Sequence, residues 1–171
     1  MTRTTLRVLL VAALMLVTLA VLVAVRGHEQ TLAEGRVVLV ELAPVDPRSL
    51  MQGDYMALRF AIDNELQART VQAGSPVLPR YAVLQLDDEG RATLAELSES
   101  PPAAAAARVA MRIRQRDGAS SIGPNAFFFE EGTAEHYTAA RWGEFRVAPN
   151  GQALLTHLRD AELQRLGVIA R

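Results

Sequence analysis

The chain contains no cysteine and no lysine, and each absence removes a class of chemistry. Without cysteine, disulfides, thiolate metal sites and thiol nucleophiles are excluded. All 18 basic residues are arginine, so a Ser–Lys catalytic dyad cannot form. A domain of this size can bury an adequate core without disulfides, which leaves the compartment open.

In the part of the chain after Gly27, acidic residues outnumber basic ones. That part holds 15 arginines against 19 acidic residues, a net charge of −4. Nucleic acid or an anionic lipid surface would need a basic face, so the balance argues against both partners. The three histidines, His28, His136 and His157, show no metal-ligand spacing. We therefore expect no nucleic acid, metal or cofactor.

Charge is absent altogether from one run, residues 8–25, which is apolar apart from Thr18. Eighteen helical residues reach about 27 Å, close to the hydrocarbon thickness of a bilayer. A cleaved signal peptide and a buried core helix are the rival interpretations. The length and the poor cleavage site favour an uncleaved anchor that contacts lipid. Arg3 and Arg7 precede the run, which favours a cytoplasmic N-terminus.

These features predict three parts. Residues 1–26 form a cytoplasmic tip and transmembrane anchor, 27–35 a polar stem, and 36–171 one extracytoplasmic domain on the periplasmic side of a bacterial inner membrane. The fold class is mainly β (α+β): a compact, mostly antiparallel β domain with one or two short helices. Expected strands are 36–42, 54–62, 80–86, 91–97, 108–116, 145–147 and 153–155.

The segments between these strands are assigned more coarsely. Residues 63–73 are a loop or a short helix, and 126–129 are a short buried segment. Thr133 can cap a helix that reaches Trp142. In the expected strand 108–116, alternate arginines line one face; that face is either solvated or a site for an anion or acidic partner.

One segment, DPRSLMQGDYMALRF, resembles the signature of the bacterial family called GDYXXLXY proteins. The residues that carry the resemblance are Asp46, Pro47, Arg48, Gly53, Asp54, Tyr55, Leu58 and Phe60, with Glu130 and Gly132 downstream. Phe60 stands where the family name has tyrosine. The resemblance implies a membrane-anchored envelope protein, often accompanied by multi-pass membrane proteins.

The motif residues allow two kinds of role. Gly53 suits a positive φ, and Asp54 can accept N–H bonds from the preceding turn. Arg48 can pair with Asp46 or Asp54, and Tyr55 would cover the turn. Such a network explains the motif as structure. Alternatively, the same loop, with Glu130 and Gly132 as a second patch, binds a partner.

Two functional hypotheses follow. The preferred one is a noncatalytic, membrane-tethered module that binds a partner membrane protein or envelope component. The competing one is an envelope hydrolase or carbohydrate-active enzyme that uses Asp54 and Glu130. The order of residues around Pro47 also resembles the substrate-side strand of membrane-anchored signal peptidases. Because Asp46 precedes Pro47 and lysine is absent, that likeness would be architectural only.

Overall fold

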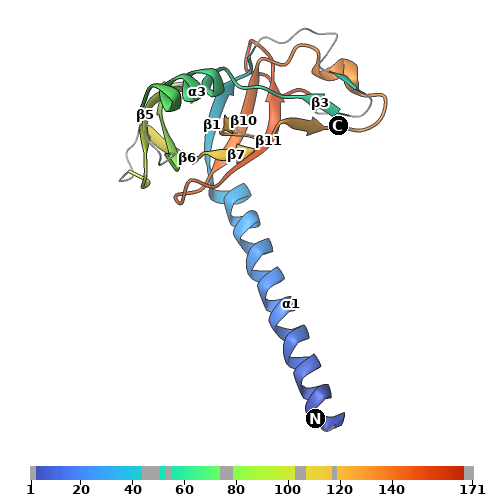
Figure 1. Ribbon diagram of the computed structural model, residues 1–171. Coiled ribbons are helices and arrows are strands. Elements are labelled where there is room, and N and C mark those ends of the chain that lie inside the picture. The colour runs from blue at the N-terminus through green and yellow to red at the C-terminus, as the bar shows by residue number, and fades with distance from the viewer. Residues whose placement is uncertain are drawn as a thin grey trace.

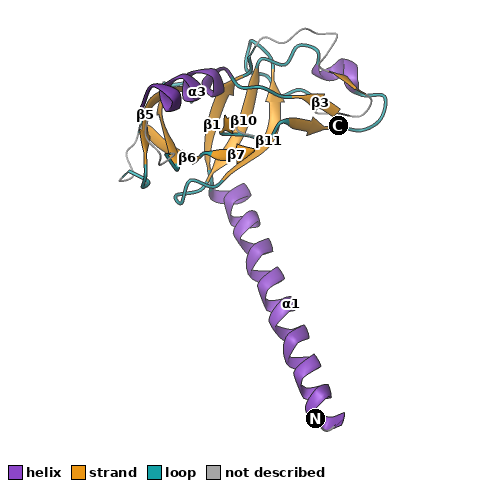
Figure 2. Cartoon of the chain, viewed as in Figure 1, coloured by secondary structure: helices purple, strands orange, loops and turns teal. Residues whose placement is uncertain are grey.

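The protein consists of one long helix and a β-rich body at its C-terminal end (Figure 1). The computed structural model describes residues 3–43, 51–52, 55–73, 79–102, 107–116 and 119–167. Figure 2 shows that the body is built mostly of strands. Every strand pair in the described residues is antiparallel. The α+β class expected from the sequence is therefore confirmed.

Helix α1, Arg3–Glu34, projects from the body as a rod (Figure 1). From Arg7 onward it is long and apolar enough to cross a membrane, and its apolar side chains are exposed, Leu16 by 70%. Because this surface is not covered by protein, the buried core helix is excluded as an interpretation. The segment expected to be a stem continues the helix, because Thr31 Oγ1 donates to Gly27 O at 2.8 Å and Gln30 bonds Glu34.

The helix is packed against the body at its last turns. Thr31 is 4% exposed, and His28 Nδ1 lies 3.3 Å from Gln152 Nε2. Gly35 ends the helix, and Arg146 Nη1 donates to its carbonyl at 3.1 Å. A Cβ at Gly35 would lie 2.2 Å from Thr31 O, so only glycine fits this junction. The body therefore sits directly on the helix.

Two three-stranded sheets form most of the body. The first has the order β1-β10-β11, comprising Arg36–Glu41, Trp142–Val147 and Ala153–Arg159, and its last two strands are joined by the turn 148–152. The second has the order β5-β4-β6, comprising Ala92–Ser98, Tyr81–Leu86 and Arg108–Arg112. Both expected hairpins, at 87–90 and 149–151, are confirmed, with Gly90 and Gly151 at φ +81°.

Shorter elements complete the body. Strands β2 (Met51–Gln52), β3 (Tyr55–Ala57) and β9 (Ala126–Phe128) form a third sheet, and β7 (Arg114–Arg116) pairs with β8 (Ala119–Ser121). Helix α3, Ala61–Ala73, buries Ile62 and Leu66, one turn apart. The core lies between these layers. Its fully buried side chains include Val38, Val40, Phe60, Leu66, Leu84, Met111, Phe145 and Leu158.

Two expected strands differ in the structure. Residues 55–62, the described part of the expected strand 54–62, do not form one strand. Tyr55–Ala57 pair with β9, Phe60 then bridges Leu42, and Ala61 begins a helix. Residues 108–116 are split at Ile113, whose N–H donates to Arg80 O at 2.9 Å. The chain changes partner there, from β4 to β8.

Two other expectations are corrected by the structure. The segment 126–129 is only partly buried: Phe127 and Phe129 pack against the core, whereas Phe128 is 75% exposed. The helix from Thr133 to Trp142 is a single 3₁₀ turn, η1 (Ala134–Tyr137), and Trp142 begins β10. Thr133 makes no side-chain cap; its Oγ1 donates back to Glu130 O at 2.6 Å and closes a turn instead.

Candidate functional site

The family-like motif reaches the described structure at Tyr55. Asp46, Pro47, Arg48, Gly53 and Asp54 lie outside the described residues, so the network expected among them stays a prediction. The same holds for the proposed carboxylate pair of Asp54 with Glu130.

Tyr55 faces an exposed aromatic side chain. It begins β3 and pairs across the sheet with Phe128 of β9. The two ring centroids lie 5.9 Å apart with the planes tilted by 44°, a favourable aromatic geometry. Tyr55 is half-buried, whereas Phe128 is 75% exposed. The motif therefore presents an aromatic pair at the surface of a short sheet.

The second expected patch follows directly from β9. Glu130 O accepts the N–H and the Oγ1–H of Thr133 at 3.1 and 2.6 Å, which forms a turn through Gly132. Gly132 has φ +78°, a conformation that favours glycine, and a Cβ there would meet nothing within 4 Å. Because β9 pairs with β3, Phe128 lies opposite Tyr55, and Glu130 follows Phe128 by two residues. The fold thus brings the two motif regions to neighbouring strands.

Leu58 and Phe60, the remaining motif residues, are core residues. They are 5% and 1% exposed, and the Phe60 ring packs on Phe145 with centroids 5.4 Å apart. A Cβ at Gly123 would lie 2.4 Å from the Phe60 ring, which shows how tightly this ring is enclosed. Their contribution to any site is therefore through packing.

A pocket of about 610 Å³ adjoins this segment. It begins where β3 ends and β9 starts, at the hydrogen bond of 2.8 Å that Leu58 N–H donates to Asn125 O. Its polar lining comes from α3 and the residue Arg59 before it, from β7 and β8, and from the loop between β8 and β9. These side chains are Arg59, Asp63, Asn64, Gln67, Arg114, Ser120, Ser121 and Asn125.

Asp63 is the most constrained polar group in the pocket. Its Oδ2 accepts Ser121 Oγ–H at 2.8 Å, and its Oδ1 accepts the Ile122 N–H at 3.1 Å. Burial raises the pKa of Asp63, and these two hydrogen bonds partly offset that effect. The pocket lining contains no histidine that could act as a base for Ser121. The arrangement suits binding and structural support of the segment after β8.

A buried carboxylate, Glu144, was not singled out in the sequence. Its side chain is fully buried, yet Arg159 and Arg165 both donate to it at distances of 2.6 to 2.9 Å. Burial opposes its charge, but the hydrogen bonds from Arg165 and Arg159 outweigh burial and lower the pKa of Glu144. Because Arg165 lies beyond β11, this cluster ties the segment after the last strand to β10.

The three histidines lie on different elements, α1, η1 and β11. Burial lowers the pKa of His157, whose Nδ1 lies 3.7 Å from Glu144 without a hydrogen-bond partner. His28 contacts Gln152, and His136 lies in η1. Within the ranges that the structure describes, no group of three potential metal ligands is present.

Comparisons with known proteins agree with the motif. No curated protein and no solved structure matches the chain. The family model described as GDYXXLXY protein matches residues 17–158, which include part of the apolar helix, the motif and both large hairpins. Since this match covers most of the chain, the protein belongs to the GDYXXLXY family.

Proposed function

We propose that this protein is a noncatalytic, membrane-anchored module whose body binds a partner through the aromatic pair Tyr55 and Phe128. The single observation that supports it is the exposure of Phe128. Among described residues beyond α1, it is the one large hydrophobic side chain that is exposed. A lone exposed apolar residue is ordinary, but this one lies opposite the motif tyrosine. Aromatic side chains are also enriched among residues that dominate binding energy.

The proposal includes retention of α1 as the anchor. Its exposed apolar surface suits lipid, and the body packs against the end of the helix without an unstructured linker. We place the N-terminus in the cytoplasm and the body on the periplasmic side of a bacterial inner membrane, following the arginines before the apolar run.

The position of the aromatic pair limits the kind of partner. Strand β1 leads away from the end of α1, and its far end lies beside the segment that follows β3, as the bridge between Leu42 and Phe60 shows. Six strand residues span about 20 Å. A multi-pass membrane partner would therefore have to contact this surface through a part that projects from the bilayer. A soluble envelope component would also be able to contact this surface away from the bilayer.

The test is extraction of the full chain in mild detergent with a C-terminal tag, followed by mass spectrometry. Phe128→Ala should remove a specific partner while leaving the thermal transition of the body unchanged, because the exposed ring contributes little to the core. Phe128→Tyr is the matched control and should retain the partner, since the ring remains. Tyr55→Ala should give the same loss as Phe128→Ala. Retention of every co-purifying protein by both alanine variants would refute the proposal.

A further inference from the structure

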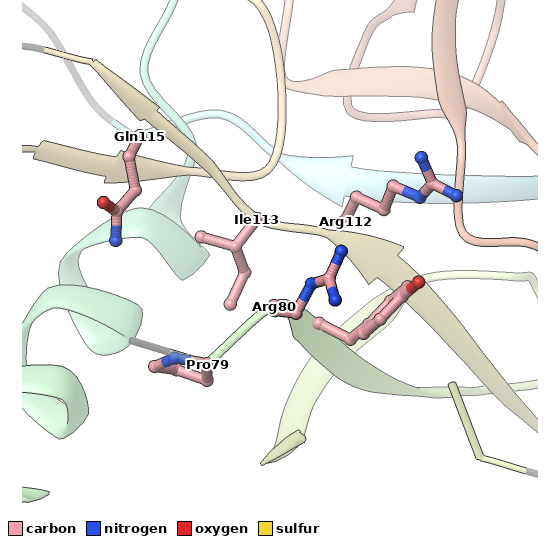
Figure 3. A pocket seen from close by; sticks show the side chains of 6 residues that line it. Pro79, Arg80, Arg112, Ile113 and Gln115 are labelled. Carbon is pink, nitrogen blue, oxygen red and sulfur yellow. The ribbon is translucent and has the colours of Figure 1, made fainter. Parts of the chain in front are cut away.

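A second pocket lies beside the turn 148–152, which contacts α1 through Gln152 and His28. It has a volume of about 280 Å³ and is lined by Pro79, Arg80, Tyr81, Arg112, Ile113 and Gln115 (Figure 3). Arg80 precedes β4, and Arg112 ends the neighbouring strand β6, so antiparallel pairing brings two arginines to one opening.

Both guanidinium groups are exposed and lack a carboxylate partner in the part of the chain that the structure describes. Arg112 uses Nε to donate to Asn150 O at 3.0 Å, which holds its stem and leaves its two terminal nitrogens available. The Arg80 side chain makes no hydrogen bond with any described residue. By contrast, Arg108 on the same strand lies 3.7 Å from Glu96. The pocket thus concentrates uncompensated positive charge.

The height of this pocket above the membrane follows from contacts with α1. His28 is three residues beyond Val25, the end of the apolar run, and therefore about 4.5 Å further along the helix axis. The polar headgroup layer is roughly 5–7 Å thick on each side of the hydrocarbon. His28 contacts Gln152, and Asn150 of the same turn accepts Arg112. The turn 148–152 thus lies at headgroup height, with the arginine pocket beside it.

We infer that Arg80 and Arg112 bind the phosphate of an anionic phospholipid headgroup in the same membrane that holds α1. Guanidinium groups match phosphate oxygens in geometry and charge. The net charge of −4 after Gly27 argues against a broad contact with an anionic lipid surface, but not against contact with a single headgroup, because screening limits the reach of each charge to about 8 Å at physiological salt. This inference rests on the proposed anchoring of α1, and it is independent of the partner at Phe128.

The experiment uses the full chain in nanodiscs of phosphatidylcholine, either alone or mixed with about 30% phosphatidylglycerol. Native mass spectrometry counts the lipids retained after release from the disc. Each arginine near an anionic surface contributes a factor of about five in affinity. Arg80→Gln should lower the phosphatidylglycerol preference about fivefold, and Arg80→Gln with Arg112→Gln about 25-fold. The single variant Arg80→Gln should fold normally, because the Arg80 side chain makes no hydrogen bond with any described residue. It therefore tests lipid binding without a change in the fold.

Arg141→Gln is the matched control, since Arg141 is exposed at the opposite end of β10 from the turn 148–152. It should leave the lipid preference unchanged. Equal weakening by this control, or no preference in the unmodified protein, would overturn the inference. Inorganic phosphate is a second arm: displacement of phosphatidylglycerol by millimolar phosphate would identify a soluble anion as the ligand and overturn the lipid assignment.

A separate measurement distinguishes failure of the anchor from failure of the lipid site. The chain has no cysteine, so a spin label at Asn150→Cys is unique. Its accessibility to lipid-soluble and water-soluble relaxing agents should place it in the headgroup layer. If the label lies at that depth but the protein shows no preference for phosphatidylglycerol, the lipid site is refuted and the anchored geometry is not. A label in bulk water refutes the anchored geometry on which the site rests.

Discussion

The buried carboxylate of Glu144 offers the sharpest test of how this body is stabilised. Glu144→Gln keeps the shape of the side chain but removes the charge that faces two arginines. In the native protein, Arg159 and Arg165 make charge-assisted bonds to it at 2.6 to 2.9 Å, and the carboxylate is fully buried. In the variant, an amide NH₂ would face a guanidinium, and two cations would remain close together without a counter-charge.

The expected cost follows from that geometry. Breaking a buried ion pair by removing one partner typically destabilises a protein by about 3–5 kcal/mol. Arg165 is 40% exposed and can turn toward water, so we expect the lower end, about 3 kcal/mol. At roughly 2–4 °C per kcal/mol for a domain of this size, Tm should fall by about 10 °C.

The assay is thermal or urea unfolding of the full chain in detergent, and tryptophan fluorescence is the signal that monitors it. Trp142 is the single tryptophan and lies two residues from Glu144, so it reports this sheet rather than α1. Glu130→Gln is the control and should change the stability by less than about 0.5 kcal/mol, because Glu130 is exposed. A loss below about 1 kcal/mol in Glu144→Gln would refute the reasoning.

The pH dependence gives an independent check of the same cluster. The folded state lowers the pKa of Glu144 below its ordinary value of 4.5. The stabilisation is therefore complete above pH 4.5 and is lost as the pH falls through the folded-state pKa. The difference in stability between the native protein and Glu144→Gln should shrink below pH 4.5 and stay constant between pH 6 and 8.

Three further substitutions test other parts of the body. Asp63→Asn should raise Tm at pH 7, because burial raises the pKa of Asp63 and penalises its charge. The advantage should begin to shrink as the pH falls through that raised pKa and should vanish below the ordinary value of 3.8, and a lower Tm at pH 7 would contradict this account. Gly123→Ala should cost about 1–3 kcal/mol in urea unfolding, because its Cβ would overlap the Phe60 ring. Gly27→Ala, where a Cβ meets nothing within 4 Å, should leave that transition unchanged and serves as its control.

Local patterns in the sequence were sufficient for several features. The apolar run of α1 and the turns of the two hairpins depend on residues close together in the chain, and the sequence predicts each of them; the helix and the last two strands extend beyond the limits expected. Asp87 illustrates why. Its Oδ1 accepts the N–H groups of Glu89 and Arg91 at 3.0 and 2.8 Å, so residues within a stretch of five form the whole turn. The antiparallel fold class followed from these turns.

Local patterns failed where strand partners change. Alternating arginines suggested one strand over 108–116, and the alternation of 54–62 suggested another. Burial does alternate through Phe60, but which strand completes the hydrogen bonds depends on distant residues such as Leu42. A strand ends when its partner does, and the partner is a tertiary property.

Residue types and short spacings along the chain are enough to predict the apolar helix, the antiparallel β class and the family motif. Only the tertiary structure decided that Glu144 is buried between two arginines, that Phe128 is exposed beside Tyr55, and that Arg80 and Arg112 share an opening near α1. Those outcomes depend on which face of each strand another element covers. Alternation identifies two faces, and packing selects which one meets the core.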